Sequence, residues 1–344
     1  MKIGLLTYHH SNNYGAVLQT YATCRILKEL GHEVEIINIR QLEKKKLRHI
    51  VFFKKDKDFA NFMNKFYPPQ TSLIESYEQL KKIKFSYDCL LVGSDQVWNP
   101  SISLDKCMAY YLDFGNSKMR RVSYASSLGV SEWPNAFEFM KPSVAKALSN
   151  FNSIAVREVT GQHLLKREFG IDSNVVLDPT MLHSSYPEII SDIPETDNMV
   201  CYLLNRTKEQ LSSVRYLSKE LKLTAQIITS VYPIPGMRYT YPPSIENWIK
   251  YIGGAKVVIT DSFHGLVFSL LYQRNFVVIA VNNGKNSRLL DLLKMVGLEN
   301  RYFLSLDEIK NSTVLNETID YSKVNQIIQE KRTDSLSYLK NALR

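Results

Sequence analysis

The stretch KVVITDSFHGLVFSLLYQRN, from Lys256 to Asn275, decides the fold. Val257 to Ile259 form a β-branched run, which predicts a buried strand. Asp261 and Ser262 come next, and both residue types favour the cap position of a helix. The apolar residues of the following LVFSLLY recur at helical spacing. The stretch therefore predicts a strand that ends directly before a helix begins.

His264 lies at this junction, with Ser262 and Gly265 beside it. Ligands of open α/β sheets bind at this edge, because helix N–H groups and the helix dipole favour an anion there. A histidine in this position can donate a proton or hold a phosphate or carboxylate. We expect His264 to be catalytic, and Ser262 and Gly265 to bind substrate. The alternative is that His264 only caps the helix or fills a polar niche.

Length and composition indicate a globular protein of two domains. The chain has 344 residues, 44% of them hydrophobic and 22% charged. No apolar run approaches the roughly 20 residues of a membrane helix, and MKIGLLTY leads into a strand pattern instead of a signal peptide. The four cysteines form no CxxC pair, so we expect a cytoplasmic protein with no metal and no cofactor.

The net charge of +9 comes in large part from Lys44 to Lys57, where basic residues alternate with apolar ones. One interpretation is peripheral contact with the anionic inner face of the membrane, where a lipid-linked substrate would be found. Another is steering of an anionic substrate. A third is a solvated loop or helix with one buried aromatic face. No recognition-helix or base-stacking signature supports nucleic-acid binding.

The N-terminal half begins with a β-loop-α-β unit. Lys2 to Tyr8 predict a strand, a helix follows, and Glu33 to Arg40 predict a second strand. The loop HHSNNYG between strand and helix lacks GxGxxG and GxxxxGK[ST], so it indicates neither a dinucleotide nor a P-loop nucleotide. It offers hydrogen-bonding groups suited to sugar hydroxyls or phosphate, from Asn12, Asn13, Tyr14 and Gly15. The alternative is an Asn-rich turn with a helix cap.

A second predicted strand end lies in YDCLLVGSDQVWN, from Tyr87 to Asn99. Asp95 follows the buried run CLLVG, where a general base would be placed. Trp98 could stack on a sugar ring, although a lone tryptophan often serves packing. The residues around Asp95 expected to line a sugar site are Ser94, Gln96, Trp98 and Asn99. A later strand, IAV, places Arg157 directly after its end.

A Ser-, Pro- and acid-rich segment at about 184–194 predicts a linker, after which a second α/β series begins. We expect a Rossmann-like domain over 1–183 on the acceptor side, and a second over 195–320. Residues 321–344 predict a long amphipathic helix that could return to the first domain. The predicted fold class is α/β, with two Rossmann-like domains facing across a cleft, as in glycosyltransferase-B enzymes.

The motifs LTYHHSNNYGAVLQTYA, VGSDQVWNP, SYASSLG, VREVTG, VLDPT, ITDSFHGLVFSL and SRLLDLLKMVGL occur in that order over nearly the whole chain. This set resembles the polysaccharide pyruvyl transferase family, whose fold is similar to the two-domain glycosyltransferase-B arrangement. Its characterised members transfer a pyruvate ketal from phosphoenolpyruvate to a sugar hydroxyl pair of a glycan or lipid-linked precursor. The family's FHG-type histidine maps onto His264 and its VRE-type arginine onto Arg157. One departure is Phe263, which stands where some members have arginine.

The resemblance implies phosphoenolpyruvate as the donor substrate, bound on the side of 195–320, and a sugar acceptor that could be lipid-linked. Arginine matches phosphate and carboxylate with a two-pronged grip, so we expect Arg157, Arg206 and Arg288 to bind the donor. His264 would act as general acid or phosphate stabiliser, and Asp95 as general base. Asp261 could cap the helix or hold the His264 tautomer.

Two alternatives remain open at this point. One is a nucleotide-sugar-dependent glycosyltransferase of the same fold, with arginine and histidine near the diphosphate. The other is a non-catalytic glycan-binding partner, which would bind glycan without turnover and tolerate loss of His264.

Overall fold

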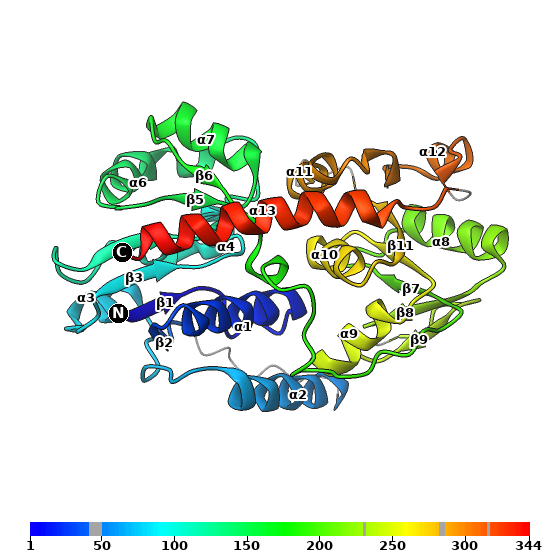
Figure 1. The fold of residues 1–344 in the computed structure, drawn as a ribbon, viewed down its shortest axis with the longest axis horizontal. Coiled ribbons are helices and arrows are strands. Elements are labelled where there is room, and N and C mark those ends of the chain that lie inside the picture. Colours follow the sequence, from blue (N-terminus) through cyan, green and yellow to red (C-terminus); the bar gives the residue numbers. More distant parts are fainter. Residues whose placement is uncertain (41–49, 230–231, 282–285, 315–316) are drawn as a thin grey trace. The chain divides into compact units, whose positions relative to one another are not determined.

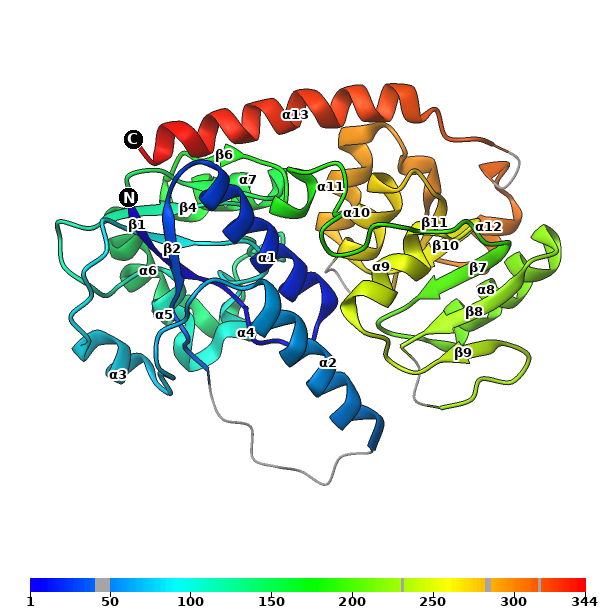
Figure 2. The same cartoon turned by 60° about the horizontal axis from the view of Figure 1, so that its bottom comes forward.

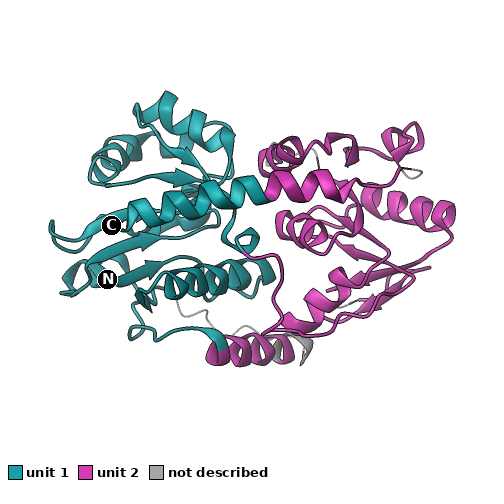
Figure 3. Ribbon diagram, in the orientation of Figure 1, with its two compact units in different colours: residues 1–46, 66–182, 329–344 teal, residues 47–65, 183–328 magenta. Residues whose placement is uncertain are grey.

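The computed structural model describes residues 1–40, 50–229, 232–281, 286–314 and 317–344, and Figures 1 and 2 show its elements in two views. The predicted basic residues Lys44 to Lys46 lie outside the described part of the chain. Two compact units make up the structure (Figure 3). Unit 1 contains residues 1–46, 66–182 and 329–344, and unit 2 contains residues 47–65 and 183–328.

Unit 1 is built on a parallel sheet with the strand order β2-β1-β3-β4. Isolated parallel bridges, Val122 to Ser153 and Ser126 to Val156, extend the sheet from β4 toward the pair β5-β6. The strands are β1 (Lys2–Leu6), β2 (Glu33–Ile36), β3 (Cys89–Val92), β4 (Arg120–Ser123), β5 (Ala155–Val156) and β6 (Asn174–Val175). Because the strands run parallel, their carboxyl ends share one edge of the sheet.

The helices of unit 1 connect these strands, as in other α/β folds. They are α1 (Tyr14–Glu29), α3 (Tyr77–Lys82), α4 (Pro100–Ser103), α5 (Cys107–Tyr110), α6 (Lys141–Leu148) and α7 (Val159–Phe169), with the 3-10 turns η1 (Leu104–Lys106), η2 (Asn135–Met140) and η3 (Pro179–Met181). Asn13 starts α1, because its side-chain oxygen accepts hydrogen bonds from the backbone N–H groups of Gly15 and Ala16.

Unit 2 is built on a six-stranded sheet with the order β12-β11-β10-β7-β8-β9, in which all pairs are parallel. The strands are β7 (Asn198–Tyr202), β8 (Thr224–Ile228), β9 (Arg238–Thr240), β10 (Val257–Thr260), β11 (Asn275–Ile279) and β12 (Tyr302–Phe303). In chain order this is the 3-2-1-4-5-6 arrangement of a Rossmann fold. Strand β10 and the last four residues of β11 are buried, which explains their continuous apolar runs.

The helices of unit 2 are α8 (Lys208–Leu221), α9 (Ile245–Gly253), α10 (Phe263–Leu271), α11 (Ser287–Val296) and α12 (Leu306–Lys310), with η4 (Glu299–Arg301). Helix α2 (Ile50–Phe66) precedes β3 in the chain, yet all of it except Phe66 belongs to unit 2. None of the described helices combines the length and hydropathy of a membrane-spanning segment.

The last helix, α13 (Tyr321–Ala342), contributes to both units. At its start, the Tyr321 hydroxyl donates to the backbone oxygen of Arg274 in unit 2. From Gln329 on it belongs to unit 1, where Ser335 accepts from the Leu177 N–H at 2.9 Å and Tyr338 donates to the Ser123 oxygen at 3.0 Å. These bonds fix the C-terminal turns to the strand ends of unit 1.

Candidate functional site

The strand order of unit 2 reverses between β7 and β10. From β7 the chain proceeds outward through β8 and β9, and it then returns to β10 and continues through β11 and β12 on the other side. At such a switch point the loops after the two central strands diverge, and ligands of doubly wound sheets bind in the opening between them. The loop after β10 is the predicted strand–helix junction, so the structure places His264 at the switch point of unit 2.

The junction itself is confirmed. Ser262 caps α10, since its hydroxyl oxygen accepts from the Gly265 N–H at 3.3 Å. The Ser262 N–H in turn donates to the Thr260 hydroxyl at 3.0 Å. His264 occupies the first turn of α10, is 7% exposed and lies edge-on to the Phe263 ring at 5.3 Å. The cap therefore belongs to Ser262, whereas the catalytic role of His264 stays a prediction.

Gly265 brings α10 close to its strand. A Cβ atom at this position would lie 2.3 Å from the Thr260 hydroxyl oxygen, which donates to the Tyr202 carbonyl. A side chain at position 265 would therefore have to displace the Thr260 side chain or the helix. The structure thus shows a packing reason for this glycine, while the expected contacts of Ser262 and Gly265 with substrate stay predictions.

Asp261 binds the loop after β7 and neither caps α10 nor contacts His264 through a described hydrogen bond. Its carboxylate accepts from the backbone N–H groups of Leu204 at 2.6 Å and Asn205 at 3.1 Å. The side-chain amides of Asn205 and Gln210 donate to it as well, at 2.8 and 3.0 Å. Asp261 therefore fixes the two loops of the switch point to each other. No local sequence pattern indicates this role, because the partners lie more than 50 residues away.

Arg206 belongs to the same loop. Its backbone has a φ of 52°, and its Nε and Nη2 donate to the carbonyl oxygens of Leu203 at 3.1 Å and Thr229 at 3.3 Å. The guanidinium therefore bridges the ends of β7 and β8. Arg288 lies in the first turn of α11, after β11, and is half-buried. Both arginines are thus at the carboxyl edge of the unit 2 sheet, as predicted, and their role as substrate ligands stays a prediction.

Lys55 is a further basic residue of unit 2 that the sequence analysis assigned only to a general basic patch. It lies on α2, and its ammonium stands 5.1 Å from the centre of the Phe59 ring. Burial and the nearby Arg206 lower the pKa of Lys55 to about 8, against the effect of Asp56. The amphipathic pattern of α2 gave no signal that this helix would join the second half of the chain.

In unit 1 the strand order reverses between β1 and β3, and Asp95 follows β3. Asp95 has a φ of 77°, and its carboxylate accepts from the Gln96 N–H at 2.8 Å. The side chain is half-buried at the carboxyl edge of the sheet. This position agrees with the expected strand end, and the role as general base stays a prediction.

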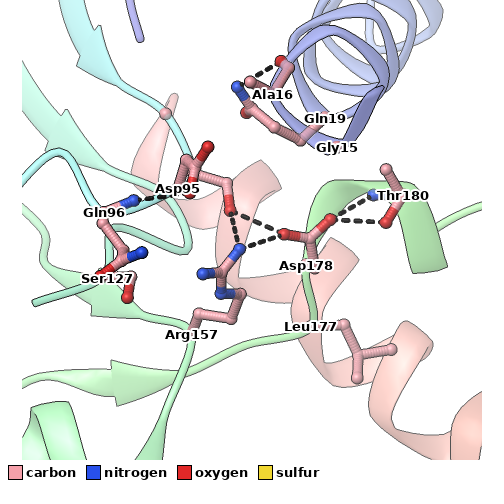
Figure 4. Close-up of polar contacts among 12 residues, drawn as sticks. Gly15, Ala16, Gln19, Asp95, Gln96, Ser127, Arg157, Leu177, Asp178 and Thr180 are labelled. Atoms are coloured by element: carbon pink, nitrogen blue, oxygen red, sulfur yellow. Dashed lines mark hydrogen bonds and ion pairs between the residues drawn. The ribbon is translucent and has the colours of Figure 1, made fainter. Parts of the chain in front are cut away.

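Arg157 lies at the centre of a buried polar network in unit 1 (Figure 4). Its Nη1 donates to Asp178 at 2.8 Å and to the Ser94 hydroxyl at 3.3 Å, and its Nε donates to Glu158 at 3.3 Å. The Arg157 side chain is only 1% exposed. Burial alone would lower the pKa of this guanidinium, but the Glu158 and Asp178 carboxylates hold it above its ordinary value.

The network gives Arg157 and Ser94 a structural role, while binding of substrate by these two residues stays a prediction. A two-pronged grip on an anion needs two adjacent guanidinium nitrogens, and each such pair in Arg157 includes a nitrogen already bonded to Asp178 or Glu158. Ser94 was expected in the substrate site, but it is fully buried and its hydroxyl donates to Asp178 at 2.8 Å. Both residues hold the loop that carries Asp95. The missing partner, Asp178, lies in the motif VLDPT, where no local pattern indicates a contact with Arg157.

Trp98 is a core residue, and the expectation that it stacks on a sugar is wrong. It is 0% exposed, and its indole lies parallel to the Tyr111 ring at 5.3 Å. Its N–H donates to the Tyr110 carbonyl at 2.8 Å. Asn99 caps α4 through a hydrogen bond from the Ser101 N–H, and Gln96 accepts from the Asn99 amide at 3.3 Å.

The loop before α1 contains both exposed and buried residues among those expected to bind substrate. Asn13 is exposed but serves as the cap, Asn12 is exposed, and Tyr14 and Gly15 are buried. Binding of substrate by these four residues stays a prediction. Among the described residues, no group of three or more His, Cys, Asp or Glu side chains is placed to hold a metal ion.

Comparison with known protein families identifies the chain. The model of the family described as polysaccharide pyruvyl transferase matches residues 13–283, which is most of the sequence. The chain belongs to the polysaccharide pyruvyl transferase family. The predicted resemblance is therefore confirmed, and the matched region includes the switch point of unit 2, whereas in unit 1 it begins after β1. No curated protein matches the chain.

Solved structures of similar fold confirm the glycosyltransferase-B class of this family member. The UDP-GlcNAc 2-epimerase of Methanocaldococcus jannaschii, in complex with UDP-GlcNAc and UDP, is 13% identical with a TM-score of 0.54, over 96% of this chain and 99% of that one. A putative UDP-N-acetylglucosamine 2-epimerase from Listeria monocytogenes is 10% identical with a TM-score of 0.55, over 95% and 90%. A spinosyn forosaminyltransferase is 12% identical with a TM-score of 0.51, over 97% and 95%. The low identities restrict the likeness to the fold.

Proposed function

We propose that this transferase moves the enolpyruvyl group of phosphoenolpyruvate onto two hydroxyls of one sugar, forming a pyruvate ketal on a surface polysaccharide or its lipid-linked precursor. Membership of the polysaccharide pyruvyl transferase family supports the reaction class. The observation that carries the proposal is the position of His264 in the first turn of α10, at the switch point of a Rossmann-ordered sheet.

Phosphoenolpyruvate has a phosphate and a carboxylate, and its site must offer cations or oriented N–H groups to both. The first turn of a helix presents backbone N–H groups without intrahelical partners, and its dipole favours negative charge. Helix α10 has this end at the switch point, and Arg206 and Arg288 supply cations at the same edge of unit 2. Unit 2 is therefore our proposed donor side.

The reaction balances without a cofactor. A proton is added to C3 of the enol ether, which leaves an oxocarbenium-like C2. One sugar hydroxyl adds to C2 and loses its proton, and the C2–O bond to phosphate breaks. The second hydroxyl then closes the ketal as its proton leaves; of the two released protons, one balances the proton taken up at C3 and the other leaves with the inorganic phosphate. His264 would deliver the proton to C3 or stabilise the departing phosphate, and Asp95 would accept a hydroxyl proton.

The acceptor and its place in the cell are part of the same proposal. Phosphoenolpyruvate is a cytoplasmic metabolite, so we place the enzyme in the cytoplasm, with peripheral contact to the membrane where the acceptor is lipid-linked. The exposed Lys54 and Lys57 on α2 are the described residues of the basic segment that would face anionic lipid.

A nucleotide-sugar-dependent glycosyl transfer is the second candidate. It is favoured by the fold likeness to a UDP-GlcNAc 2-epimerase solved with UDP-GlcNAc and UDP. Both reactions would place an anion at the start of α10, but they release different products. Glycosyl transfer releases a nucleoside diphosphate, whereas pyruvyl transfer releases inorganic phosphate.

The test is a product assay on a panel of acceptors. The purified enzyme is incubated with phosphoenolpyruvate or with nucleotide-sugars, together with galactosides, glucosides and mannosamine derivatives. Acceptor-dependent release of phosphate from phosphoenolpyruvate supports the proposal. Release of nucleoside diphosphate with no phosphate release would replace it with the glycosyltransferase, and glycan binding without either product would indicate a non-catalytic partner.

A further inference from the structure

Three basic side chains of unit 1 gather at the carboxyl edge of its sheet, and none of them has a role in the function proposed above. His10 follows β1, Arg40 follows β2, and Lys106 lies in η1 after β3. Because β1, β2 and β3 are neighbouring parallel strands, the segments after them start at the same edge. His10 and Lys106 lie in the segments after the two strands between which the order reverses, and these segments meet where the Tyr8 ring contacts the Tyr110 ring at 5.0 Å.

Two of these side chains have a buried nitrogen without a hydrogen-bond partner in the described part of the chain, and the third has a long ion pair. The Nδ1 of His10 and the Nε of Arg40 are buried and make no hydrogen bond among the described residues. Lys106 is only 8% exposed, and its ammonium reaches one carboxylate, that of Asp105, at 3.4 and 3.5 Å. The Asp105 side chain is 60% exposed, so this pair is long and solvated. Buried donors of this kind are costly unless something accepts from them.

Neighbouring cations affect the ionisation of His10. Burial, together with the charges of His9, Arg40 and Lys106, lowers the pKa of His10 to about 3. Among the residues that the structure describes, no carboxylate counters these effects on the ring. The His10 ring is therefore uncharged near neutral pH, and Arg40 and Lys106 carry the positive charge of the cluster, which an anion would stabilise.

The position of His10 is fixed before any ligand arrives. The His9 ring packs edge-on against the His10 ring at 4.9 Å. His9 is held in turn by the Thr7 carbonyl at 3.2 Å and the Asn38 side chain at 3.0 Å, and the Tyr67 hydroxyl donates to its backbone oxygen. Such support lowers the entropy that a ligand must remove on binding.

We infer that His10, Arg40 and Lys106 form an anion subsite of unit 1 that takes a phosphate group of a substrate. Phosphate oxygens accept hydrogen bonds from imidazole, guanidinium and ammonium alike, and the carboxyl edge at a switch point is where ligands of doubly wound sheets bind. Given the function proposed above, the phosphate has two sources. One is phosphoenolpyruvate, and the other is the diphosphate that links an acceptor sugar to its nucleotide or lipid carrier.

The experiment measures binding to the full-length protein by calorimetry, with phosphoenolpyruvate and with inorganic pyrophosphate as probes. The test variant is Arg40→Gln/Lys106→Gln. The matched control is Arg167→Gln/Lys166→Gln, which removes one arginine and one lysine from exposed positions on α7 of the same unit. We expect the test variant to weaken binding of at least one probe by about tenfold or more, and the control to bind as the wild type does.

The two probes separate the sources. A loss confined to phosphoenolpyruvate assigns the subsite to the donor, and a loss confined to pyrophosphate assigns it to the acceptor's carrier. Equal losses support a subsite that takes either phosphate. Wild-type binding of both probes by a folded test variant would overturn the inference, as would an equal loss in the control.

A measurement on the wild type guards against a variant that fails to fold. In an NMR titration, histidines are labelled with carbon-13 at Cε1, and the His10 resonance is assigned by its absence in His10→Gln. This resonance should shift when a probe that binds the protein is added. An unmoved His10 resonance at saturation would also overturn the inference. Binding of pyrophosphate requires no turnover. The subsite can therefore be supported even if no pyruvyl transfer is detected, and each proposal can be refuted without the other.

Discussion

Replacing Arg157 with lysine keeps the positive charge in unit 1 but removes the fork that joins Ser94, Asp178 and Glu158. One ammonium cannot reproduce the two charged contacts at 2.8 and 3.3 Å that the guanidinium makes with separate nitrogens. A hydrogen bond to a charged group contributes about 1.5–3 kcal/mol, and an uncompensated buried carboxylate costs about 3–5 kcal/mol. We predict that the free energy of unfolding of unit 1 falls by about 3 kcal/mol, between these ranges.

Urea denaturation followed by tryptophan fluorescence measures this change. Trp98 and Trp133 lie in unit 1 and Trp248 in unit 2. In a Trp248→Phe background, the fluorescence change therefore reports on unit 1. The control is Arg167→Lys, since Arg167 also pairs with a glutamate at 2.8 Å but is 53% exposed. We expect the control to change the free energy by about 0.5 kcal/mol or less.

A drop for Arg157→Lys no larger than that of the control would refute the structural role of this arginine. The buried network would then contribute little to stability. Arg157 would again be a candidate for direct contact with substrate, and a raised KM for phosphoenolpyruvate in the stable variant would be the sign of it.

Three further predictions concern the strand ends. Gly265→Ala should destabilise unit 2 by about 1–3 kcal/mol, because the added Cβ would lie 2.3 Å from the Thr260 hydroxyl; an unchanged thermal unfolding midpoint would contradict the close packing. Asn13→Ala should cost about 1 kcal/mol in urea denaturation through loss of the α1 cap, and Asn13→Ser should recover most of it. His10 has a pKa lowered to about 3, below the unfolded value of about 6.5, so its contribution is complete above pH 6.5 and is lost as the pH falls toward 3, by up to about 1.4 kcal/mol per pH unit. The loss of stability between pH 7 and pH 5 should therefore be smaller in His10→Gln than in the wild type, and equal losses would show that His10 is not buried among cations.

Local sequence patterns were sufficient where the cause of a structure is local. The β-branched run before Asp261 and the cap at Ser262 predicted the strand–helix junction of β10 and α10, because a buried strand and a helix cap each depend on a few neighbouring residues. The fold class could be predicted as well, because strands and helices alternate along the chain and the family motifs occur in order.

Partners distant in the sequence decided the rest. Asp261 contacts a loop more than 50 residues earlier, and Arg157 meets Asp178 only when β5 and β6 lie side by side. The residues next to Trp98 in the sequence indicate a loop. In the structure Tyr111 packs against Trp98, which lies in the core. The grouping of His10 with Arg40 and Lys106 likewise depends on strand order, which single motifs do not contain.

The most direct test of the central claim follows carbon-13 from labelled phosphoenolpyruvate into the acceptor sugar, for the wild type, His264→Ala and the control His163→Ala, whose histidine is exposed on α7. We expect the wild type and the control to form a labelled pyruvate ketal with one phosphate released per ketal, and His264→Ala, although folded, to form none. Ketal formation by His264→Ala at the wild-type rate would contradict the role of this histidine. The absence of label in every acceptor, with no phosphate released by the wild type, would contradict pyruvyl transfer itself.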